Sequence, residues 1–192
     1  MRKIVSFVHM SLDGFVATSN GGLDWIIVNE EIFEYVEQRI KETDTALYGR
    51  VTYQMMENYW PTAADQPTAT KHDIEHSRWY KKATKVVLSR TMKRENPANT
   101  KIISSNLTDE ITKLKQGTGS DILMFGSPTA THALMAENFI DEYWLFINPI
   151  LLGQGVPLFQ GIKNRTPLKL VSSKIFSSGV VCLQYEDRNA IR

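Results

Sequence analysis

The fold predicted for this chain depends chiefly on residues 121–159, which read DILMFGSPTATHALMAENFIDEYWLFINPILLGQGVPLF. The first five residues form an apolar run of strand length, and Gly126 ends it. Ser127 offers an N-cap oxygen and Pro128 suits the first position of a helix, so we expect a helix to follow. A second apolar run, residues 143–147, comes after that helix. The stretch therefore predicts a strand, a tight turn, a helix and another strand.

The turn at Gly126 and Ser127 is a candidate anion site. A strand-to-helix turn aims backbone N–H groups and the positive end of a helix dipole at one point, where a phosphate or pyrophosphate fits. An ordinary β–α connection has the same sequence features, so the turn alone leaves the function open.

Length and composition favour one α/β domain over residues 1–192. Hydrophobic residues make up 42% of the chain, which is enough for a substantial core. The 22 basic and 21 acidic residues give a net charge of +1. This balance gives no electrostatic reason to expect binding to nucleic acid or to an anionic membrane, so any bound anion must be held by local groups.

The single cysteine and the N-terminal sequence indicate in which cellular compartment we expect the protein. Cys182 lies in the apolar run of residues 180–183, which predicts a buried strand thiol without a disulfide partner. The apolar run at the N-terminus is too short for a signal peptide or a membrane span. We therefore expect a cytoplasmic protein.

Asn29 is expected to cap the first helix, whose apolar positions are Ile32, Phe33, Val36 and Ile40. Glu30 and Glu31 fall in its first turn, where carboxylates interact favourably with the dipole. Alternatively, one of them lies in a cleft under the expected loop of residues 15–25, which has Gly21 and Gly22 in its middle, and burial there would raise its pKa and allow proton relay. Trp25 either anchors that loop on the core or lines a pocket for a planar ligand.

A second strand-to-helix junction follows at Gly49. Residues 46–48 predict a strand, and the helix after Gly49 is expected to run to about residue 58, before a polar loop over residues 59–70. Arg50 at the helix start suits bidentate phosphate contacts, although a surface arginine is the simpler interpretation.

His72 and His76 are four residues apart on an expected helix, a spacing that some metal sites use. The segment lacks the His-Glu-x-x-His order of zinc hydrolases and an evident third ligand. We therefore expect a solvated helix face and no metal.

The remaining elements complete the predicted fold. Residues 85–88 and 101–104 are expected strands, and Thr108 is the expected cap of a helix in which Lys113 and Lys115 complement the dipole. Residues 169–176 and 180–187 predict an antiparallel hairpin. Alternating strands and helices followed by a hairpin indicate an α/β fold with a mixed, mostly parallel central sheet flanked by helices on both faces.

Several motifs together resemble the dihydrofolate reductase-like superfamily, and within it the reductase domain of riboflavin biosynthesis and its stand-alone relatives. The matching motifs are SLDGFVA (residues 11–17), GRVT (49–52), VLSR (87–90), Gly126-Ser127, IDE (140–142) and the loop of residues 149–159. Each motif is weak alone, but their order and spacing cover nearly the whole chain.

The resemblance implies a three-layer fold, bound NADPH and hydride transfer to a C=N group or sugar carbonyl of a heterocyclic substrate. It also implies a homodimer, for which residues 143–147 are the expected contact region. In the implied cofactor site, Ala17 borders the nicotinamide, Gly49, Arg50 and Thr52 hold phosphates on the adenosine side, Ser89 and Arg90 lie beside the adenine ribose and its 2′-phosphate, and Gly126, Ser127, Thr129 and Ala130 surround the pyrophosphate.

The implied catalytic residues are carboxylates. Glu30 lies five residues after Trp25, the spacing that places the substrate carboxylate in dihydrofolate reductases, so it is the first candidate for proton relay and Asp13 is the second. Trp25 is the candidate for substrate contact.

The chain also departs from the family pattern. Gly126-Ser127-Pro128 stands where many relatives have Gly-Gly, and one cysteine cannot supply the zinc ligands of the deaminase found in bifunctional relatives. No basic residue occurs between Trp25 and Arg39 to bind a substrate phosphate, which argues against the riboflavin precursor itself. A dihydrofolate reductase, or a nucleotide-binding sensor without catalysis, remains an alternative.

Overall fold

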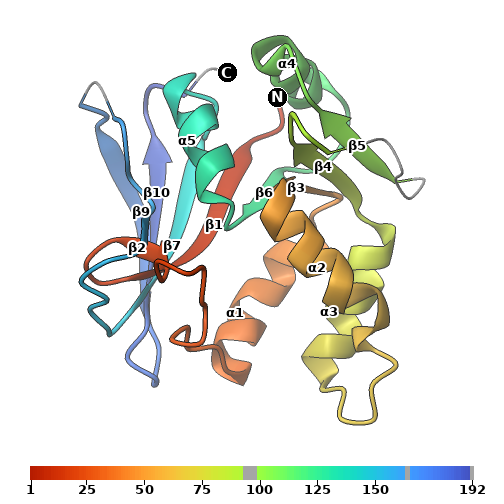
Figure 1. Cartoon of the computed structure of the whole chain (residues 1–192), viewed down its shortest axis with the longest axis vertical. Helices are drawn as coiled ribbons and strands as arrows, with labels where there is room; N and C mark the ends of the chain where they lie inside the picture. Colours follow the sequence, from red (N-terminus) through yellow and green to blue (C-terminus); the bar gives the residue numbers. More distant parts are fainter. Residues whose placement is uncertain (93–98, 163–164, 191–192) are drawn as a thin grey trace.

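A computed structural model describes residues 1–92, 99–162 and 165–190. Its centre is an eight-stranded sheet in the order β5-β4-β3-β6-β1-β7-β10-β9 (Figure 1). Strand β10 runs opposite to the other seven strands. This confirms the mixed, mostly parallel sheet and its terminal hairpin. The strands are β1 (Ile4–Ser11), β3 (Thr45–Gly49), β4 (Thr84–Leu88), β5 (Thr100–Ile103), β6 (Ile122–Phe125), β7 (Glu142–Asn148), β9 (Leu168–Ile175) and β10 (Val181–Asp187).

A separate two-stranded ribbon pairs β2 (Phe15–Ala17) with β8 (Val156–Pro157). The ribbon joins the loop after β1 to the loop after β7. These two loops lie far apart in the sequence, and Figure 1 shows them together at one end of the sheet.

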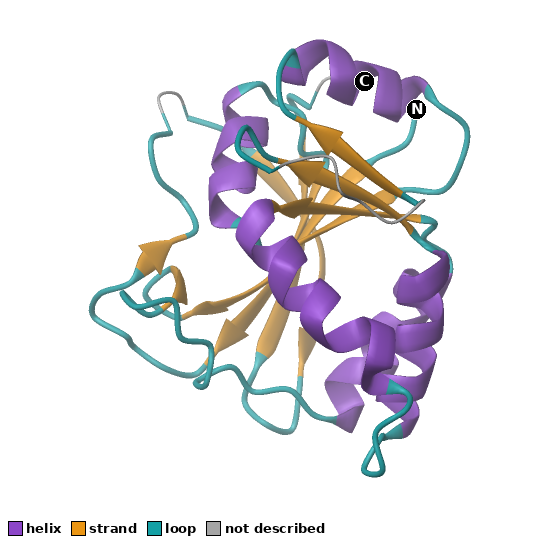
Figure 2. Cartoon of the chain, turned by 45° about the vertical axis from the view of Figure 1, so that its right-hand side comes forward, coloured by secondary structure: helices purple, strands orange, loops and turns teal. Residues whose placement is uncertain are grey.

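The described residues form five helices, which cover both faces of the sheet as predicted (Figure 2). They are α1 (Glu30–Lys41), α2 (Arg50–Ala63), α3 (Lys71–Lys82), α4 (Leu107–Gln116) and α5 (Pro128–Ala136). Within the described ranges, no helix combines the length and the apolarity that crossing a bilayer requires.

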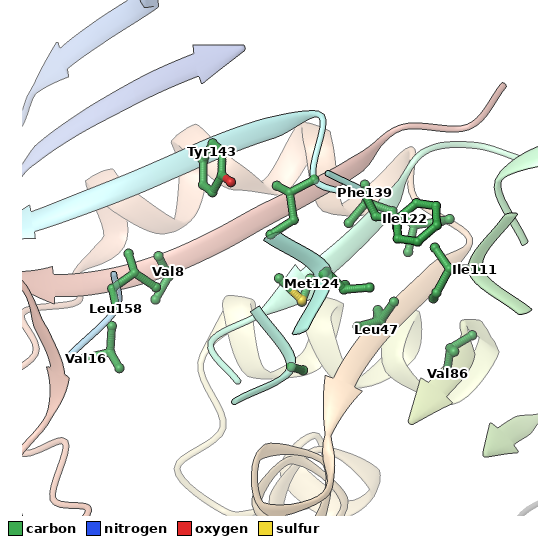
Figure 3. Close-up of a cluster of buried hydrophobic side chains, with 14 of the residues drawn as sticks. Val8, Val16, Leu47, Val86, Ile111, Ile122, Met124, Phe139, Tyr143 and Leu158 are labelled. Carbon is green, nitrogen blue, oxygen red and sulfur yellow. The ribbon is translucent and has the colours of Figure 1, made fainter. Parts of the chain in front are cut away.

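Each face of the sheet has its own hydrophobic core. On one face, Ile111 of α4 and Leu134 of α5 pack on the strands with Leu47 and Met124 (Figure 3). This core extends to Val16 of the β2 ribbon, so the ribbon lies on the same face as α5. Burying such side chains contributes about 1.5–3 kcal/mol each and fixes the register of the strands.

The opposite core lies under α1, α2 and α3. Three of the four predicted apolar positions of α1, Ile32, Val36 and Ile40, are buried there, whereas Phe33 is only partly buried and stacks on His72. Cys182 of β10 is fully buried in the same cluster. Burial raises the pKa of the Cys182 thiol to about 12, so it is an unreactive core residue. The prediction of a buried thiol is confirmed, and so is that of the apolar face of α1 at these three positions.

Helix α2 is longer than predicted. It continues to Ala63 through Pro61, although the sequence indicated a loop from residue 59. Trp60 explains the difference: its indole donates to the Met56 sulfur, and its ring lies 3.9 Å from the ring of His76 between centroids. Packing of α2 against α3 therefore overrides the local helix-breaking signal.

The prediction of a solvated histidine face on α3 is wrong. His76 is buried with only 8% of its surface exposed, and His72 stacks on Phe33 of α1 at 3.6 Å between ring centroids. Burial lowers the pKa of both imidazoles, that of His76 to about 3. The two histidines are therefore neutral packing residues between α1, α2 and α3.

Helix α4 begins earlier than predicted, and one of its lysines has another role. Its N-cap is Asn106, in a left-handed conformation with φ 52°, in place of Thr108. Lys115 is buried at the end of the helix and forms an ion pair with Asp141 at 2.8 Å. Asp141 also accepts from the Ile4 backbone N–H, so the pair joins α4 to the starts of β1 and β7. Lys115 also lies in the last turn of α4 with Lys113, as predicted.

Candidate functional site

The candidate site lies where the order of the strands reverses. Helix α1 lies in the connection from β1 to β3, which is on one side of β1. Helix α5 connects β6 to β7, which is on the other side of β1. Strand β6 lies between β1 and β3, so the carboxyl ends of all three strands meet at this point. In open α/β sheets such a switch point forms a crevice that binds ligands.

Two helix N-termini lie side by side at this crevice. The backbone N–H of Gly49, just before α2, donates to Ser127 Oγ, just before α5, at 2.9 Å. A methyl group on Gly49 would lie 3.5 Å from Ser127 Cβ and 3.7 Å from Ala130 Cβ. The structure therefore brings Gly49, Gly126, Ser127 and Ala130 close together in space.

Ser127 is the N-cap residue of α5 as predicted, but its side chain does not make the expected capping hydrogen bond. Both Gly126 and Ser127 adopt positive φ, +51° and +58°, and the Ser127 hydroxyl donates to the Phe125 carbonyl at 2.8 Å. This oxygen is used within the turn, so it makes no capping hydrogen bond to the helix. Pro128 is at the start of the helix as expected. The first-turn N–H groups of α5 are consequently left without a side-chain acceptor.

The starts of α2 and α5 differ from those of the other helices. Neither has a side-chain cap, and neither carries an acidic residue in its first turn. By contrast, α1 and α3 are capped by side chains, and α1, α3 and α4 all have acidic first turns. The two helices at the crevice therefore present unneutralised positive dipole ends, which suit an anion.

Arg50, Thr52 and Thr129 lie around this pair of helix ends. Arg50 is the first residue of α2; it is exposed, and its guanidinium donates to Gln54 at 3.1 Å. Thr52 lies near Gly126, where an added methyl group would be 3.9 Å from the Thr52 methyl. Thr129 is exposed in the first turn of α5. These side chains flank the crevice from both helices.

Ser89 and Arg90 follow the end of β4, the strand next to β3. The Ser89 N–H donates to the Ile103 carbonyl, and its hydroxyl accepts from the Met92 N–H at 3.0 Å. Arg90 is exposed. Both residues lie at the carboxyl edge of the sheet, but within the described part of the chain they make no hydrogen bond to Gly49 or Ser127.

Strand β1 has a free edge beside the crevice. It pairs with β7 as far as Ser11, but with β6 only as far as Phe7, because Gly126 turns the chain away after donating to the Phe7 carbonyl. Residues 8–11 therefore have no pairing strand on the β6 side within the described structure. A flat ligand with amide groups can pair with such an edge.

The β2 ribbon forms one wall near this edge. Gly155 passes so close to Ala17 that a methyl group there would lie 2.3 Å from the Ala17 carbonyl oxygen. This confirms that the glycine-bearing loop of residues 149–159 makes a close approach. Asp13 fastens the same loop, because its carboxylate accepts from Ser11 Oγ at 2.6 Å and from the N–H groups of Leu152 and Gly153.

These bonds bear on the chemistry of Asp13. The Ser11 hydroxyl, followed by the backbone N–H groups of Gly153 and Leu152, lowers the pKa of the carboxyl group. A carboxylate that is ionised and held by three donors is suited to positioning a loop and poorly suited to giving a proton.

Trp25 and Glu30 lie beyond the end of β1. The Trp25 indole donates to the Gly22 carbonyl at 3.2 Å, so it is held within its own loop, half-buried. Glu30 begins α1 and lines a shallow groove with Phe33, Glu34 and His72 of α3. Glu31 is bound to Ser177 of the terminal hairpin at 2.6 Å. Of the two glutamates, Glu30 is the one whose carboxylate is not tied to the hairpin.

Two polar residues at the crevice were not identified from the sequence. His9 lies in the free stretch of β1, and Asn148 ends β7 opposite Ser11. Both are polar residues within otherwise apolar strands, which was the available signal. Their pairing across 139 residues of sequence could be seen only in the folded chain.

Comparison with known proteins identifies the family. The model of the RibD C-terminal domain matches residues 2–182. The chain is 34% identical to the uncharacterized protein YyaP of Bacillus subtilis over 186 residues, covering 96% of this chain and 94% of YyaP. It is 28% identical to the uncharacterized protein YwjB of the same organism over 180 residues, covering 93% and 95%.

Solved structures share the fold. A protein from Shewanella sp. PV-4 named for riboflavin biosynthesis superposes with a TM-score of 0.75 at 23% identity, covering 97% of this chain and 99% of that one. RibD of Acinetobacter baumannii superposes with a TM-score of 0.68 at 20% identity, covering 97% of this chain but 58% of the longer protein. The chain belongs to the RibD C-terminal domain family.

Proposed function

We propose that the protein is an NADPH-dependent reductase of the RibD type, which transfers a hydride to a C=N group or sugar carbonyl of a heterocyclic substrate. The observation that carries the proposal is the pair of uncapped, acid-free helix N-termini joined by the Gly49–Ser127 hydrogen bond at the strand switch point. A dinucleotide has a doubly charged pyrophosphate to fill this position.

The residues present fit the cofactor. Gly126, Ser127, Thr129 and Ala130 would hold the pyrophosphate through the first turn of α5. Phosphate on the adenosine side would be bound by Gly49, Arg50 and Thr52. The 2′-phosphate of the ribose would be bound by Ser89 and Arg90. Ala17 and the free edge of β1 would border the nicotinamide, which supplies the hydride when bound.

The family resemblance supports Glu30 as the residue for proton transfer and Trp25 as the residue for substrate contact. In the structure, Glu30 lines the groove with α3 and Trp25 is bonded within its own loop. The contacts of Asp13 to Leu152 and Gly153 favour a positioning role for this second candidate. The protein's contribution is otherwise to align two rings and exclude water, because the cofactor carries the difficult step.

The proposal includes a homodimer. The expected contact region, residues 143–147, belongs to β7, which pairs with β1 and β10 on its two sides and is therefore unavailable for edge pairing. Edge strand β9 has the exposed apolar residues Leu170, Val171 and Ile175. An apolar edge of this kind is normally covered, so we assign the contact to β9. Light scattering of the protein and its Ile175→Lys variant tests this assignment. We expect the parent to be a dimer and the variant a monomer. If both proteins are monomers, or both are dimers, the assignment is contradicted.

The test of function is a titration of the purified protein with NADPH and NADH, followed by protein and reduced-nicotinamide fluorescence. Saturable, NADPH-selective binding supports the cofactor assignment, and NADPH oxidation with dihydropterins or ribosylaminopyrimidines then separates the substrate classes. If neither NADPH nor NADH binds, the proposal is contradicted. If NADPH binds but is not oxidised with any of the acceptors, the alternative of a nucleotide-binding sensor without catalysis is favoured.

A further inference from the structure

His9 is a titratable side chain at the candidate site that the family motifs do not account for. Its ring stacks on Phe146 of β7, with centroids 4.9 Å apart and an interplanar angle of 24°. It lies two residues past Phe7, the last residue of β1 that pairs with β6. The imidazole is therefore fixed by an aromatic neighbour beside the open edge of the strand.

The amide of Asn148 orients the imidazole. Asn148 Oδ1 accepts from the Ile27 N–H at 2.8 Å, and its Nδ2 donates to the Phe146 carbonyl at 3.1 Å. These bonds place the NH₂ group beside both the Met10 carbonyl and His9 Nδ1, each of which lies 3.4 Å from Nδ2. Because Nδ2 is only a donor, His9 Nδ1 acts as the acceptor and the ring proton resides on Nε2.

His9 is uncharged at neutral pH, because burial lowers its pKa to about 4. Nε2 has no hydrogen-bond partner among the described residues, and it is not one of their buried unpartnered atoms. The side chain is only half-buried. Nε2–H is consequently a neutral donor, held in one orientation and open to a ligand.

We infer that His9 is a substrate-binding residue whose Nε2–H donates to a carbonyl oxygen or ring nitrogen of a planar heterocycle. The inference rests on the proposed function, and it specifies the substrate class of that site: an uncharged, flat ring with an acceptor atom on its edge. A neutral donor recognises such an atom without requiring a charge on the substrate. This agrees with the absence of basic residues between Trp25 and Arg39.

The test uses 5,6-diaminouracil as the probe, titrated by calorimetry into the protein alone and into the NADP⁺-loaded protein. The informative variant is His9→Phe, which keeps an aromatic ring on Phe146 but lacks the donor. His9→Gln restores an N–H donor without the imidazole. Loss of one neutral hydrogen bond predicts roughly five- to tenfold weaker probe binding in His9→Phe, and binding by His9→Gln within about threefold of the parent.

A purely structural role for His9 predicts a different pattern. In that case His9→Phe would preserve probe affinity, and His9→Gln, which loses the stacking on Phe146, would be the weaker binder. The melting temperature of His9→Phe should match that of the parent, which separates local recognition from misfolding.

The outcomes distinguish the two proposals. Equal probe affinity in the parent and His9→Phe, or no binding of the probe to the parent in either form, overturns the role of His9. Probe binding that depends on His9 while neither NADP⁺ nor NADPH binds supports the role of His9 and contradicts the reductase assignment.

Discussion

The Gly49 backbone N–H and the Ser127 hydroxyl, 78 positions apart in sequence, form a 2.9 Å hydrogen bond that joins the start of α2 to the start of α5. The same hydroxyl donates to the Phe125 carbonyl at 2.8 Å. One buried side chain therefore fixes the spacing of the two helix ends that suit an anion.

Ser127→Ala is expected to destabilise the protein by about 1–3 kcal/mol, because the Gly49 N–H loses its acceptor. Ser127→Gly loses the same bonds but relieves the left-handed backbone conformation at φ +58°, so it should be about 1 kcal/mol more stable than Ser127→Ala. Urea unfolding of the three proteins measures both differences. Equal stability of all three would mean that the hydrogen bond is unimportant.

Gly126 and Gly49 form a matched pair for backbone strain. Gly126 has φ +51°, so Gly126→Ala is expected to cost roughly 1–2 kcal/mol. Gly49 has φ −80° and room for a methyl group, so Gly49→Ala should change stability by less than about 1 kcal/mol in either direction. Thermal or urea unfolding compares the two, and the opposite ranking would contradict the assigned turn geometry.

Removal of both Arg50 and Arg90 by alanine substitution is expected to weaken NADPH binding at least tenfold and leave NADH binding nearly unchanged. Each charge-assisted hydrogen bond to a 2′-phosphate contributes about 1.5–3 kcal/mol. Lys113→Ala, at an exposed lysine of α4, controls for net charge. An unaltered preference for NADPH in the double variant would exclude these arginines as the source of selectivity.

The buried pair Lys115–Asp141 predicts an asymmetric response to substitution. Lys115→Met leaves Asp141 buried without its cation and should destabilise the fold by about 3–5 kcal/mol. Lys3→Met, which removes the partly exposed partner of Glu142, should cost less than about 1 kcal/mol. Denaturant unfolding measures both variants, and similar losses would show that burial of the pair has little energetic effect.

His76 predicts a loss of stability at acid pH. Its folded pKa is lowered to about 3, first by burial and then by the charge of His72, whereas Asp73 opposes the shift. In the unfolded chain the imidazole of His76 takes up a proton near pH 6.5, whereas in the folded protein it does so only near pH 3. Between these two pH values the free energy of unfolding therefore falls by up to about 1.4 kcal/mol for each unit by which the pH is lowered. Substitution His76→Leu should make unfolding less pH-dependent between pH 6 and 4. An unchanged slope there would assign the acid sensitivity to other groups.

Local elements were predictable from the sequence because they depend on neighbouring residues. The Asn29 cap accepts from Ile32 three positions away, Pro128 begins α5, and the β9–β10 hairpin turns at Gly179 with φ +85°. The apolar spacing of Ile32, Val36 and Ile40 predicted the buried face of α1 because a helix repeats every 3.6 residues.

Errors arose where distant packing altered a local preference. Helix α2 passes through Pro61 because Trp60 packs against His76, and that same packing buries a histidine face expected to be solvated. Ser127 is the N-cap residue of α5 as predicted, but its hydroxyl bonds to Phe125 and Gly49.

By itself, the sequence determined most strand and helix segments, the mixed sheet with its terminal hairpin, and the family, because these depend on periodicity, turn chemistry and motif order. It did not predict the β2–β8 ribbon, which joins two segments that were expected to be loops. Only the tertiary structure decided which polar groups meet: Gly49 with Ser127, His9 with Asn148, and Lys115 with Asp141. A hydrogen bond needs its two atoms within about 3.5 Å in suitable directions. For residues that lie on different strands and helices, that geometry is set by the packing of the whole sheet.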